Sequence, residues 1–416
     1  MKPDIHADIM AVQALGAASP TDREEATARM EPLLVKEASP RRGQLNDLAL
    51  ELATKSVAFR EKLPEGVRSA LADLVRSMNC YYSNLIEGHD THPVDIERAL
   101  RNDYSREPRK RDLQHEATAH IEVQRWIDGG ALKGRAATQR SICEIHRRFY
   151  ELLPEELCWA EDSETHERVR VTSGELRAHD VRVGDHIAIS PGAIPRFLVR
   201  FEHAYSCLGK MDALVGVAAA HHRLLWIHPF LDGNGRVARL MSHAMLRDAL
   251  DTGGIWSVSR GFARNVASYK AHLTRCDMPR RNDLDGRGSL SEEELANFTE
   301  FFLATCIDQV SFMEGLVEPR RLRTRFLLWI HEEQALGHVP TKARDVLTAI
   351  LDRGELPRAE VPGIVGAGDR HARRIVAALV EKGVVPSSGP RDPLRIAFPA
   401  TLAARLMPGL FPEKPA

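Results

Sequence analysis

Residues 228–239 read His228-Pro229-Phe230-Leu231-Asp232-Gly233-Asn234-Gly235-Arg236-Val237-Ala238-Arg239. The stretch gathers a histidine, a carboxylate, two glycines, an amide and two arginines. An apolar, helix-like run from Met211 to Ile227 precedes it, and apolar residues recur at helical spacing from Val237 to Met245. The polar cluster therefore lies in a short loop that leads into a helix N-terminus, where free backbone N–H groups and the helix dipole favour anions.

The residue types of this loop suit a phosphate ligand. Gly233 and Gly235 let the backbone turn with positive φ and approach a ligand closely. Arg236 and Arg239 lie three positions apart, so both leave one face of the first helical turn. There they can hold phosphate oxygens in bidentate fashion.

Two further side chains of the loop can act on a bound phosphate. Asp232 can hold Mg²⁺ against phosphate oxygens, because Mg²⁺ prefers one or two carboxylates plus phosphate oxygens to a cage made of protein alone. His228 is the only side chain of the stretch that ordinarily titrates near neutral pH, so it is the candidate base. The residues alone predict a phosphate-binding loop with a base beside it.

The same stretch resembles the signature of the Fic family, H-x-F-x-[D/E]-G-N-G-R-x-x-R, and matches it at every fixed position. The resemblance implies a protein adenylyltransferase (AMPylator), which transfers AMP from ATP to Ser, Thr or Tyr hydroxyls of target proteins and releases pyrophosphate. It implies a mainly α fold, a Fic-type helical bundle with a β-hairpin flap. AMP is the expected group, although some Fic relatives move other phosphate-containing groups.

The family's roles carry over onto this sequence residue by residue. His228 would take the proton of the target hydroxyl, and Asp232 would place Mg²⁺ across the α- and β-phosphates of ATP. The nucleotide would be held by Gly233, Asn234, Gly235, Arg236, Arg239 and Tyr269. Many Fic proteins carry two adjacent tyrosines at the adenine pocket, whereas here Tyr269 is followed by Lys270.

A second motif lies far upstream, at residues 83–88. By itself it predicts a helix that ends at Gly88 in a C-cap. Through Ser83, Glu87 and Gly88 it also resembles the inhibitory motif of Fic proteins, [S/T]-x-x-x-E-[G/N]. The resemblance implies that Glu87 pairs with Arg239 and withholds it from the γ-phosphate, so that the enzyme inhibits itself in cis. An alternative is that Glu87 activates water and removes AMP from modified proteins.

Residues 168–190 change character, because valines and isoleucines alternate there with polar residues. With turns at Gly174 and at Gly184-Asp185, the pattern predicts a β-hairpin in an otherwise helical protein. The plain interpretation is a surface hairpin. The resemblance implies instead a flap over the active site, on which a target segment docks by strand addition. The docking residues would be Val183, His186 and Ile187.

Breaks in the pattern divide the chain into three parts. Residues 1–101 are predicted to form an N-terminal helical region that contains the inhibitory helix. Residues 102–335 are predicted to form the Fic catalytic core, and residues 341–416 a small separate domain. Helices are predicted from Asp22 to Met78, with breaks at Ser39-Pro40 and Leu63-Pro64. A polar linker is predicted at residues 102–113.

The third part resembles a winged helix-turn-helix. A turn at 366–369 precedes a helix from Arg370 to Lys382, and residues 384–385 and 394–397 are predicted to pair as the wing. Four cations of this helix could touch DNA phosphates: Arg370, Arg373, Arg374 and Lys382. The alternatives are a solvated face or a protein contact. A transcription regulator or adaptor acting through 341–416 is the non-enzymatic alternative for the whole chain.

Composition limits the remaining classes. The chain has 416 residues and a net charge of −1, so any nucleic-acid surface must be local. No apolar run approaches the roughly 20 residues of a membrane span. Six cysteines without C-x-x-C spacing, and no visible signal peptide, predict a reduced, cytoplasmic protein. The expected partners are a target protein with an exposed hydroxyl and the chain itself, through auto-modification. DNA binding through residues 341–416 and formation of a homodimer are further candidate interactions.

Two other motifs, a metal-binding helix and a dinucleotide-binding loop, are excluded by their spacing or by the surrounding sequence pattern. His115 and His120 lie five positions apart, whereas a metal-binding helix needs its histidines four apart. Gly233, Gly235 and Ala238 fit a dinucleotide fingerprint, but the chain lacks the alternating strands and helices of that fold.

Overall fold

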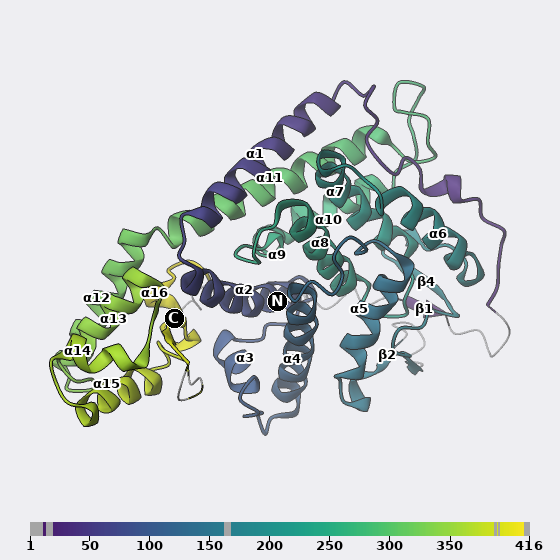
Figure 1. The fold of residues 1–416 in the computed structure, drawn as a ribbon. Helices are drawn as coiled ribbons and strands as arrows, with labels where there is room; N and C mark the ends of the chain where they lie inside the picture. Colours follow the sequence, from purple (N-terminus) through teal and green to yellow (C-terminus); the bar gives the residue numbers. More distant parts are fainter. Residues whose placement is uncertain (1–10, 14–19, 162–167, 387–388, 390–391, 412–416) are drawn as a thin grey trace, which may run out of the picture.

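The computed structural model describes residues 11–13, 20–161, 168–386, 389 and 392–411, and its fold is mainly α, as the sequence predicts (Figure 1). The helices are α1 (Arg42–Glu61), α2 (Glu65–Ile86), α3 (Pro93–Ala99), α4 (Pro108–Asp128), α5 (Gln139–Glu151), α6 (Ile194–Tyr205), α7 (Lys210–Ile227), α8 (Asn234–Leu250), α9 (Val258–Arg264), α10 (Val266–Cys276), α11 (Glu292–Leu316), α12 (Pro319–Ala335), α13 (Ala343–Arg353), α14 (Val361–Val365), α15 (Asp369–Glu381) and α16 (Ala403–Leu406). The strands are β1 (Ala11–Gln13), β2 (Trp159–Glu161), β3 (Arg168–Arg170), β4 (Asp180–Val183), β5 (His186–Ile187), β6 (Glu355–Leu356) and β7 (Leu394–Arg395). None of the helices in the described ranges is both long and apolar enough to cross a membrane.

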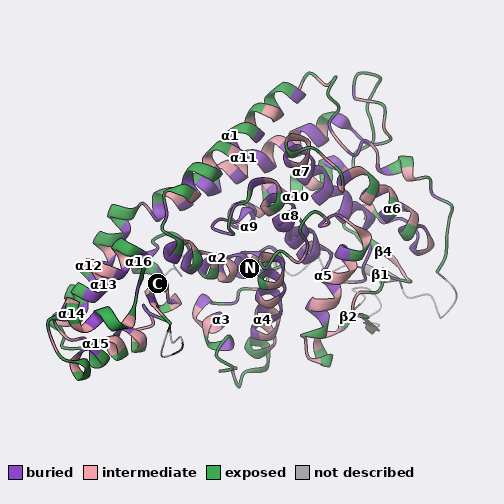
Figure 2. Ribbon diagram, viewed as in Figure 1, coloured by how far each residue is buried: buried purple, intermediate pink, exposed green. Residues whose placement is uncertain are grey.

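Helices α7 and α8 form the centre of the molecule. They pack against each other and are joined by the loop 228–233. Both are buried along most of their length (Figure 2). A helix that is apolar on every side needs neighbours on every side, and α1, α6 and α11 supply them for α7. The signature loop is therefore fixed at both ends by the best-buried helices of the fold.

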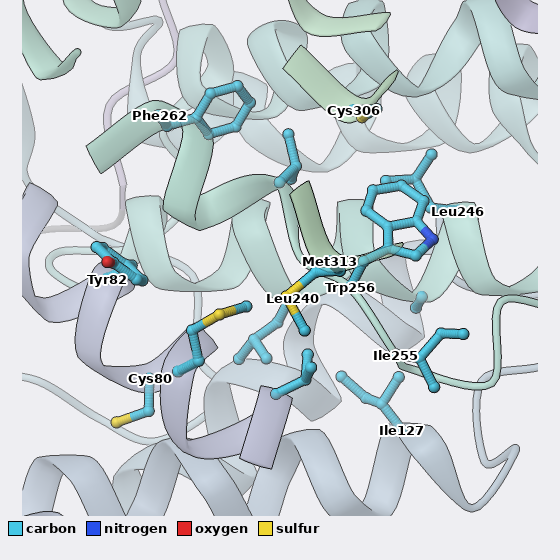
Figure 3. Packing of buried hydrophobic residues seen from close by; sticks show 14 of the residues in the cluster. Cys80, Tyr82, Ile127, Leu240, Leu246, Ile255, Trp256, Phe262, Cys306 and Met313 are labelled. Carbon is cyan, nitrogen blue, oxygen red and sulfur yellow. The ribbon is translucent and has the colours of Figure 1, made fainter. Parts of the chain in front are cut away.

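Helix α2, which carries the upstream motif, is anchored in the same core. It packs against α4 and α9, while α1 and α11 run side by side along one edge of the molecule (Figure 1). Cys80 of α2, Leu240 of α8 and Met313 of α11 belong to the same cluster of buried residues (Figure 3). All three are at most 1% exposed. Helix α2 is therefore part of the same close-packed core as α8.

The C-terminal part, α12 to α16, gathers at one end of the molecule (Figure 1). Its last described residues return to α2. The Tyr82 hydroxyl donates to the carbonyl of Leu410 at 2.6 Å, and the Phe411 ring lies edge-on to Tyr81 at 5.5 Å. Arg260 donates to the carbonyl of Gly409 at 2.9 Å. Residues 409–411 therefore contact the helix that carries Ser83.

Two predicted boundaries are wrong. Residues 22–41 are mostly irregular, with a single 3₁₀ turn at Thr27–Met30, and are held by contacts distant in sequence, such as the Glu25 carboxylate accepting from the Ser190 backbone at 2.9 Å. Pro32 has no N–H to continue a helix there. The linker predicted at 102–113 ends early, because α4 begins at Pro108, a residue that suits the first helical turn.

The hairpin predicted over residues 168–190 is two separate pairings. Strand β3 pairs with β2, which lies upstream, and only β4 and β5 form a hairpin across Gly184-Asp185. Strand β1 pairs with the other edge of β4. Alternation of apolar and polar residues reports which face of a strand is buried, not which strand is its partner.

The predicted wing also pairs differently. Strand β7 pairs with β6 rather than with residues 384–385, although the Ala397 N–H donates to the carbonyl of Val384 at 2.8 Å. Helices α13, α14 and α15 pack against one another beside this small sheet. Strand β6 follows α13 directly, so the chain closes its sheet with an earlier segment than the sequence pattern indicated.

Candidate active site

His228 lies at the C-terminus of α7, where the chain takes a left-handed turn with φ 51° and ψ 62°. Its backbone N–H donates to Leu224 at 3.0 Å, and its carbonyl accepts from Arg177 at 2.7 Å. The residue is 6% exposed. Burial, with help from Arg177 and His186, lowers the pKa of His228 to about 3. The imidazole is therefore neutral at neutral pH and able to accept a proton.

The loop after His228 is shaped by its own side chains. Asn234 accepts from the Phe230 backbone N–H at 3.0 Å and donates to the Phe230 carbonyl at 2.8 Å. Phe230 is fully buried and its ring stacks on His146 at 4.0 Å. His146 accepts from the Gly174 N–H at 2.9 Å and faces the Asp232 carbonyl at 3.3 Å, so its ring fixes the loop from outside. The side chain of Asn234 is thus occupied within the loop, and its backbone is what remains for a ligand.

Asp232 presents a carboxylate at the open side of the loop. Its side chain is 39% exposed, and one oxygen accepts from the Tyr150 hydroxyl at 2.5 Å. No group of three or more His, Cys, Asp or Glu side chains arranged for a metal exists within the described part of the chain. One exposed carboxylate fits Mg²⁺ in the way the ion is usually held beside nucleotides, with phosphate oxygens and water completing the shell.

Both signature arginines are held by side chains from other helices. Arg239 donates through Nε to the Ser83 hydroxyl at 2.9 Å and forms an ion pair with Glu87, both at the end of α2. Arg236 forms an ion pair with Glu116 of α4 at 2.9 Å. Each arginine side chain is less than a tenth exposed. In this conformation, neither guanidinium is available to a phosphate.

The two carboxylates stay ionised beside these arginines. Burial acts to raise the pKa of Glu87, but Arg239 and Arg236 outweigh it and hold that pKa below its ordinary value. Burial likewise acts to raise the pKa of Glu116, and Arg236 together with His89 brings it below the ordinary value. His89 meets Glu116 at 2.9 Å. Opposite charges in a poorly hydrated space explain both shifts.

The two glycines of the signature, Gly233 and Gly235, occupy crowded positions. At Gly233 φ is +79°, and a Cβ would lie 3.1 Å from the Tyr150 ring. At Gly235 a Cβ would collide with the Glu87 carboxylate. Gly235 therefore allows α2 to approach α8 closely enough for Glu87 to reach Arg239.

Tyr269 is buried among aromatic side chains. It is 2% exposed, its ring stacks on Phe262 at 4.4 Å, and its hydroxyl meets His221 Nε2 at 2.6 Å. His221 and His222 are also buried, and His222 faces Asp277 at 3.0 Å. In this conformation Tyr269 packs in the core rather than lining an open pocket.

The β4–β5 hairpin carries the three predicted docking residues. Val183 is 38% and Ile187 66% exposed, so both present apolar surface. His186 turns inward and its Nε2 meets the carbonyl of Trp226 at 2.8 Å. Strand β4 lies in the middle of its sheet, so β5 and β1 are the two edge strands. Through the contact of His186 with Trp226, the hairpin is held against the end of α7, two residues before His228.

Three residues of the site were missed from the sequence: Arg177, Tyr150 and Glu116. Their partners lie 51, 82 and 120 residues away, respectively. Tyr150 falls on the apolar face of an amphipathic helix, where a core position is the default interpretation. No local pattern marks Arg177 or Glu116.

Comparison with known proteins agrees with this geometry. A model of the Fic/DOC family matches residues 136–246, which include β4, β5, α7 and the signature loop. The chain is 26% identical over 171 residues to "Protein adenylyltransferase Fic" of Drosophila virilis and 27% identical over 171 residues to the protein of that name from Drosophila mojavensis. Each match covers 41% of this chain, and 32% and 31% of those relatives. The chain thus spans about a third of the length of the curated relatives it matches.

Solved structures of this family are also similar. A Fic family protein from Desulfovibrio desulfuricans G20 aligns over 88% of this chain and 98% of its own, with a TM-score of 0.49 and 16% identity. Fic-1 from C. elegans aligns over 66% of this chain and 72% of its own, with a TM-score of 0.45 and 17% identity. By the family match and the named relatives, residues 136–246 are similar to a Fic domain.

Proposed function

We propose that this chain is a protein adenylyltransferase, which transfers AMP from ATP to a hydroxyl of a protein and releases pyrophosphate. The observation that carries the proposal is the signature loop itself. A neutral His228 lies at the end of α7, and the loop and helix that follow it carry Asp232, Arg236 and Arg239. Relatives that match 41% of this chain are named for the same activity.

The reaction follows from the positions of these groups. A Ser, Thr or Tyr side chain docked along β5 would give its proton to His228 as its oxygen attacks the α-phosphorus. The bond from the α-phosphorus to the bridging oxygen then breaks, and pyrophosphate leaves. Positioning and charge neutralisation supply most of the rate in transfers of this kind.

The chain's own residues hold the nucleotide in this proposal. The backbone of Gly233, Asn234 and Gly235 would bind phosphate oxygens, and Arg236 would neutralise their charge after leaving its ion pair with Glu116. When bound, Mg²⁺ would neutralise charge on the α- and β-phosphates, and Asp232 would hold it. Tyr269 would contact adenine only after moving out from its contact with Phe262.

We also propose that the chain inhibits itself. An arginine that is held by Glu87 cannot bind the γ-phosphate, so ATP would be held in a pose unsuited to attack at the α-phosphorus. The ion pair between Arg239 and Glu87 supports this proposal. Removal of AMP from modified proteins by a water that Glu87 activates is the alternative role of the same carboxylate.

His228→Gln tests the proposed activity in a chain that also carries Glu87→Gly, so that inhibition does not mask the result. We expect AMP incorporation into the chain itself, measured by intact mass after incubation with ATP and Mg²⁺, to disappear with His228→Gln. ATP binding, measured by calorimetry, should persist because His228 does not hold the phosphates. Continued incorporation at the parent rate would exclude His228 as the base.

We retain the division of the chain into residues 1–101, 102–335 and 341–416 as a proposal. For the last part we propose a contact with DNA through Arg370, Arg373 and Arg374, which all lie on the exposed face of α15. Lys382 is less suited, because it pairs with Glu333 at 2.5 Å. Binding of duplex DNA that weakens steeply with salt would support the contact, and equal binding by a chain with all three arginines changed to glutamine would exclude it.

A further inference from the structure

Arg177 is a buried cation that binds only backbone oxygens. It lies between β3 and β4 and is 3% exposed. Its Nε donates to the carbonyl of His228 at 2.7 Å, Nη1 to His179 at 2.7 Å and Nη2 to Ile189 at 2.6 Å. A longer bond of 3.5 Å runs to Ile227. Its backbone N–H also donates to Pro229 at 2.9 Å.

These carbonyls belong to two separate pieces of the site. His179 immediately precedes β4 and Ile189 lies two residues after β5, so together they form the base of the flap hairpin. Ile227, His228 and Pro229 form the turn that carries the candidate base. One guanidinium therefore joins the base of the flap to the catalytic turn.

Burying the charged guanidinium of Arg177 costs free energy, so its position calls for an explanation. Burial lowers the pKa of Arg177 to about 10, yet the group remains charged at neutral pH. Among the residues that the structure describes, no carboxylate forms an ion pair with it, although Asp180 and Glu25 act on its charge from farther away. A buried charge without a partner is expensive, and apolar residues often stabilise such a position as well. Only the rigid, planar donor fork of arginine reaches carbonyls on several sides at once.

We propose that Arg177 is a positioning residue that sets the placement of His228 relative to the flap strand on which the target hydroxyl docks. The inference rests on the proposed function, because the docked hydroxyl belongs to that reaction. His228 needs such support, since its left-handed backbone is uncommon for a residue other than glycine. A shift of about 1 Å between a base and its substrate can cost on the order of a hundredfold in rate.

Arg177 also acts on the charge of His228. The charged or titratable groups that influence the imidazole are Arg177, His186 and Asp232, in addition to burial. Arg177 opposes protonation, so its removal raises the pKa of His228. Because the neutral imidazole is the active form, the loss of rate on the acid side moves to higher pH. A purely structural role for Arg177 would not move this limb of the pH profile.

The test compares Arg177→Gln, Arg177→Lys and the control Arg170→Gln, each in the Glu87→Gly chain. Arg170 is an exposed arginine of β3 that pairs with Glu155 at 3.3 Å, away from the turn. The readouts are the single-turnover rate of AMP incorporation at saturating ATP, its pH profile, and the ATP dissociation constant. We expect Arg177→Gln to lower the rate at least about tenfold, to shift the acid limb to higher pH, and to leave ATP affinity within about twofold. Arg177→Lys should keep the acid limb and recover part of the rate.

Several outcomes decide against the proposal. An unchanged rate and pH profile in Arg177→Gln would overturn it, and so would a parallel loss of ATP affinity in a folded Arg177→Lys protein. If Arg177→Gln does not fold, the rate of AMP incorporation by Arg177→Lys decides. One ammonium cannot span the same carbonyls, so an unchanged rate in Arg177→Lys would overturn the proposal. If the Glu87→Gly parent transfers no AMP, the proposed function fails first. Hydrogen exchange then still tests Arg177, since segments 179–189 and 227–233 should exchange faster in Arg177→Lys and not in Arg170→Gln.

Discussion

At the scale of single residues, burial decides what His228 can do. An ordinary histidine titrates near pH 6.5, whereas burial lowers the pKa of this one to about 3. The imidazole is therefore a permanent neutral acceptor across the physiological range. Its neighbours in the loop are equally constrained, because Asn234 binds Phe230 and Asp232 accepts from Tyr150. The chemistry depends on the few side-chain atoms that this network leaves exposed.

Tyr150→Phe tests the support of Asp232. The change removes the hydroxyl at 2.5 Å from the carboxylate and keeps the ring that lies against Gly233. Loss of a supporting hydrogen bond typically weakens a metal ligand on the order of tenfold or more. In the Glu87→Gly chain, we expect the Mg²⁺ concentration for half-maximal AMP transfer to rise by about that factor, with the rate at saturating Mg²⁺ retained.

Tyr205→Phe is the matched control, because that buried hydroxyl donates to the carbonyl of Leu33 and not to the loop. Identical Mg²⁺ curves for Tyr150→Phe and Tyr205→Phe would contradict a supporting role for Tyr150.

At the scale of elements, α2, α4 and α8 are joined by a buried ion cluster. Asp128, at the end of α4, meets Arg76 of α2 at 2.9 Å. The same carboxylate meets His243 at 2.8 Å and Arg247 at 3.1 Å, both on α8. Burial acts to raise the pKa of Asp128, but His243 and Arg76 outweigh it and bring the pKa to about 2. The cluster fixes the two helices that carry Glu87 and Arg239.

Asp128→Asn should destabilise the fold. Removing one member of a buried ion cluster leaves uncompensated charge and costs about 3 kcal/mol or more. The folded pKa of Asp128 lies below the unfolded value, so its contribution is complete above about pH 4 and is lost as pH falls towards 2. Urea unfolding at pH 7 should therefore show a large deficit that shrinks below pH 4. A deficit that is the same at both pH values would contradict the role of the charge.

Some helices and the signature loop can be predicted from the sequence, whereas the contacts between distant segments cannot. Helical periodicity predicts α7, α8 and α15, and a contiguous motif predicts the loop between α7 and α8. The contacts from Arg177, Tyr150 and Glu116 could not be predicted, because tertiary packing alone brings each to its partner. For the same reason strand pairing was misassigned, since β3 and β7 pair with upstream strands that the pattern does not identify.

At the scale of the whole molecule, residues 409–411 reach back to the helix that holds Arg239. Phe411 contacts Tyr81 and Tyr82, and the Tyr82 hydroxyl donates to Leu410. Tyr82 directly precedes Ser83, which accepts from Arg239. The C-terminal part therefore supports α2 in the position that pairs Glu87 with Arg239.

Phe411→Ala tests this support. Loss of the ring contacts removes about 1 kcal/mol, which corresponds to roughly a fivefold change in an equilibrium. We expect AMP incorporation by the otherwise unchanged chain to rise by up to that factor, and incorporation by the Glu87→Gly chain to stay the same. Phe398→Ala is the control, because Phe398 contacts Phe326 of α12. An equal rise from both substitutions would point to general loosening of the C-terminal part.

The central claim is that a Fic active site is present and that Glu87 restrains it. The most direct measurement is the initial rate of AMP incorporation from labelled ATP by the unchanged chain, by Glu87→Gly and by Glu87→Gly with Arg239→Ala. A charge-assisted hydrogen bond contributes about 1.5–3 kcal/mol, and every 1.4 kcal/mol is a factor of ten. We therefore predict a rise on the order of tenfold or more in Glu87→Gly, and its loss when Arg239 is also replaced. Equal rates in the unchanged chain and in Glu87→Gly would contradict the account.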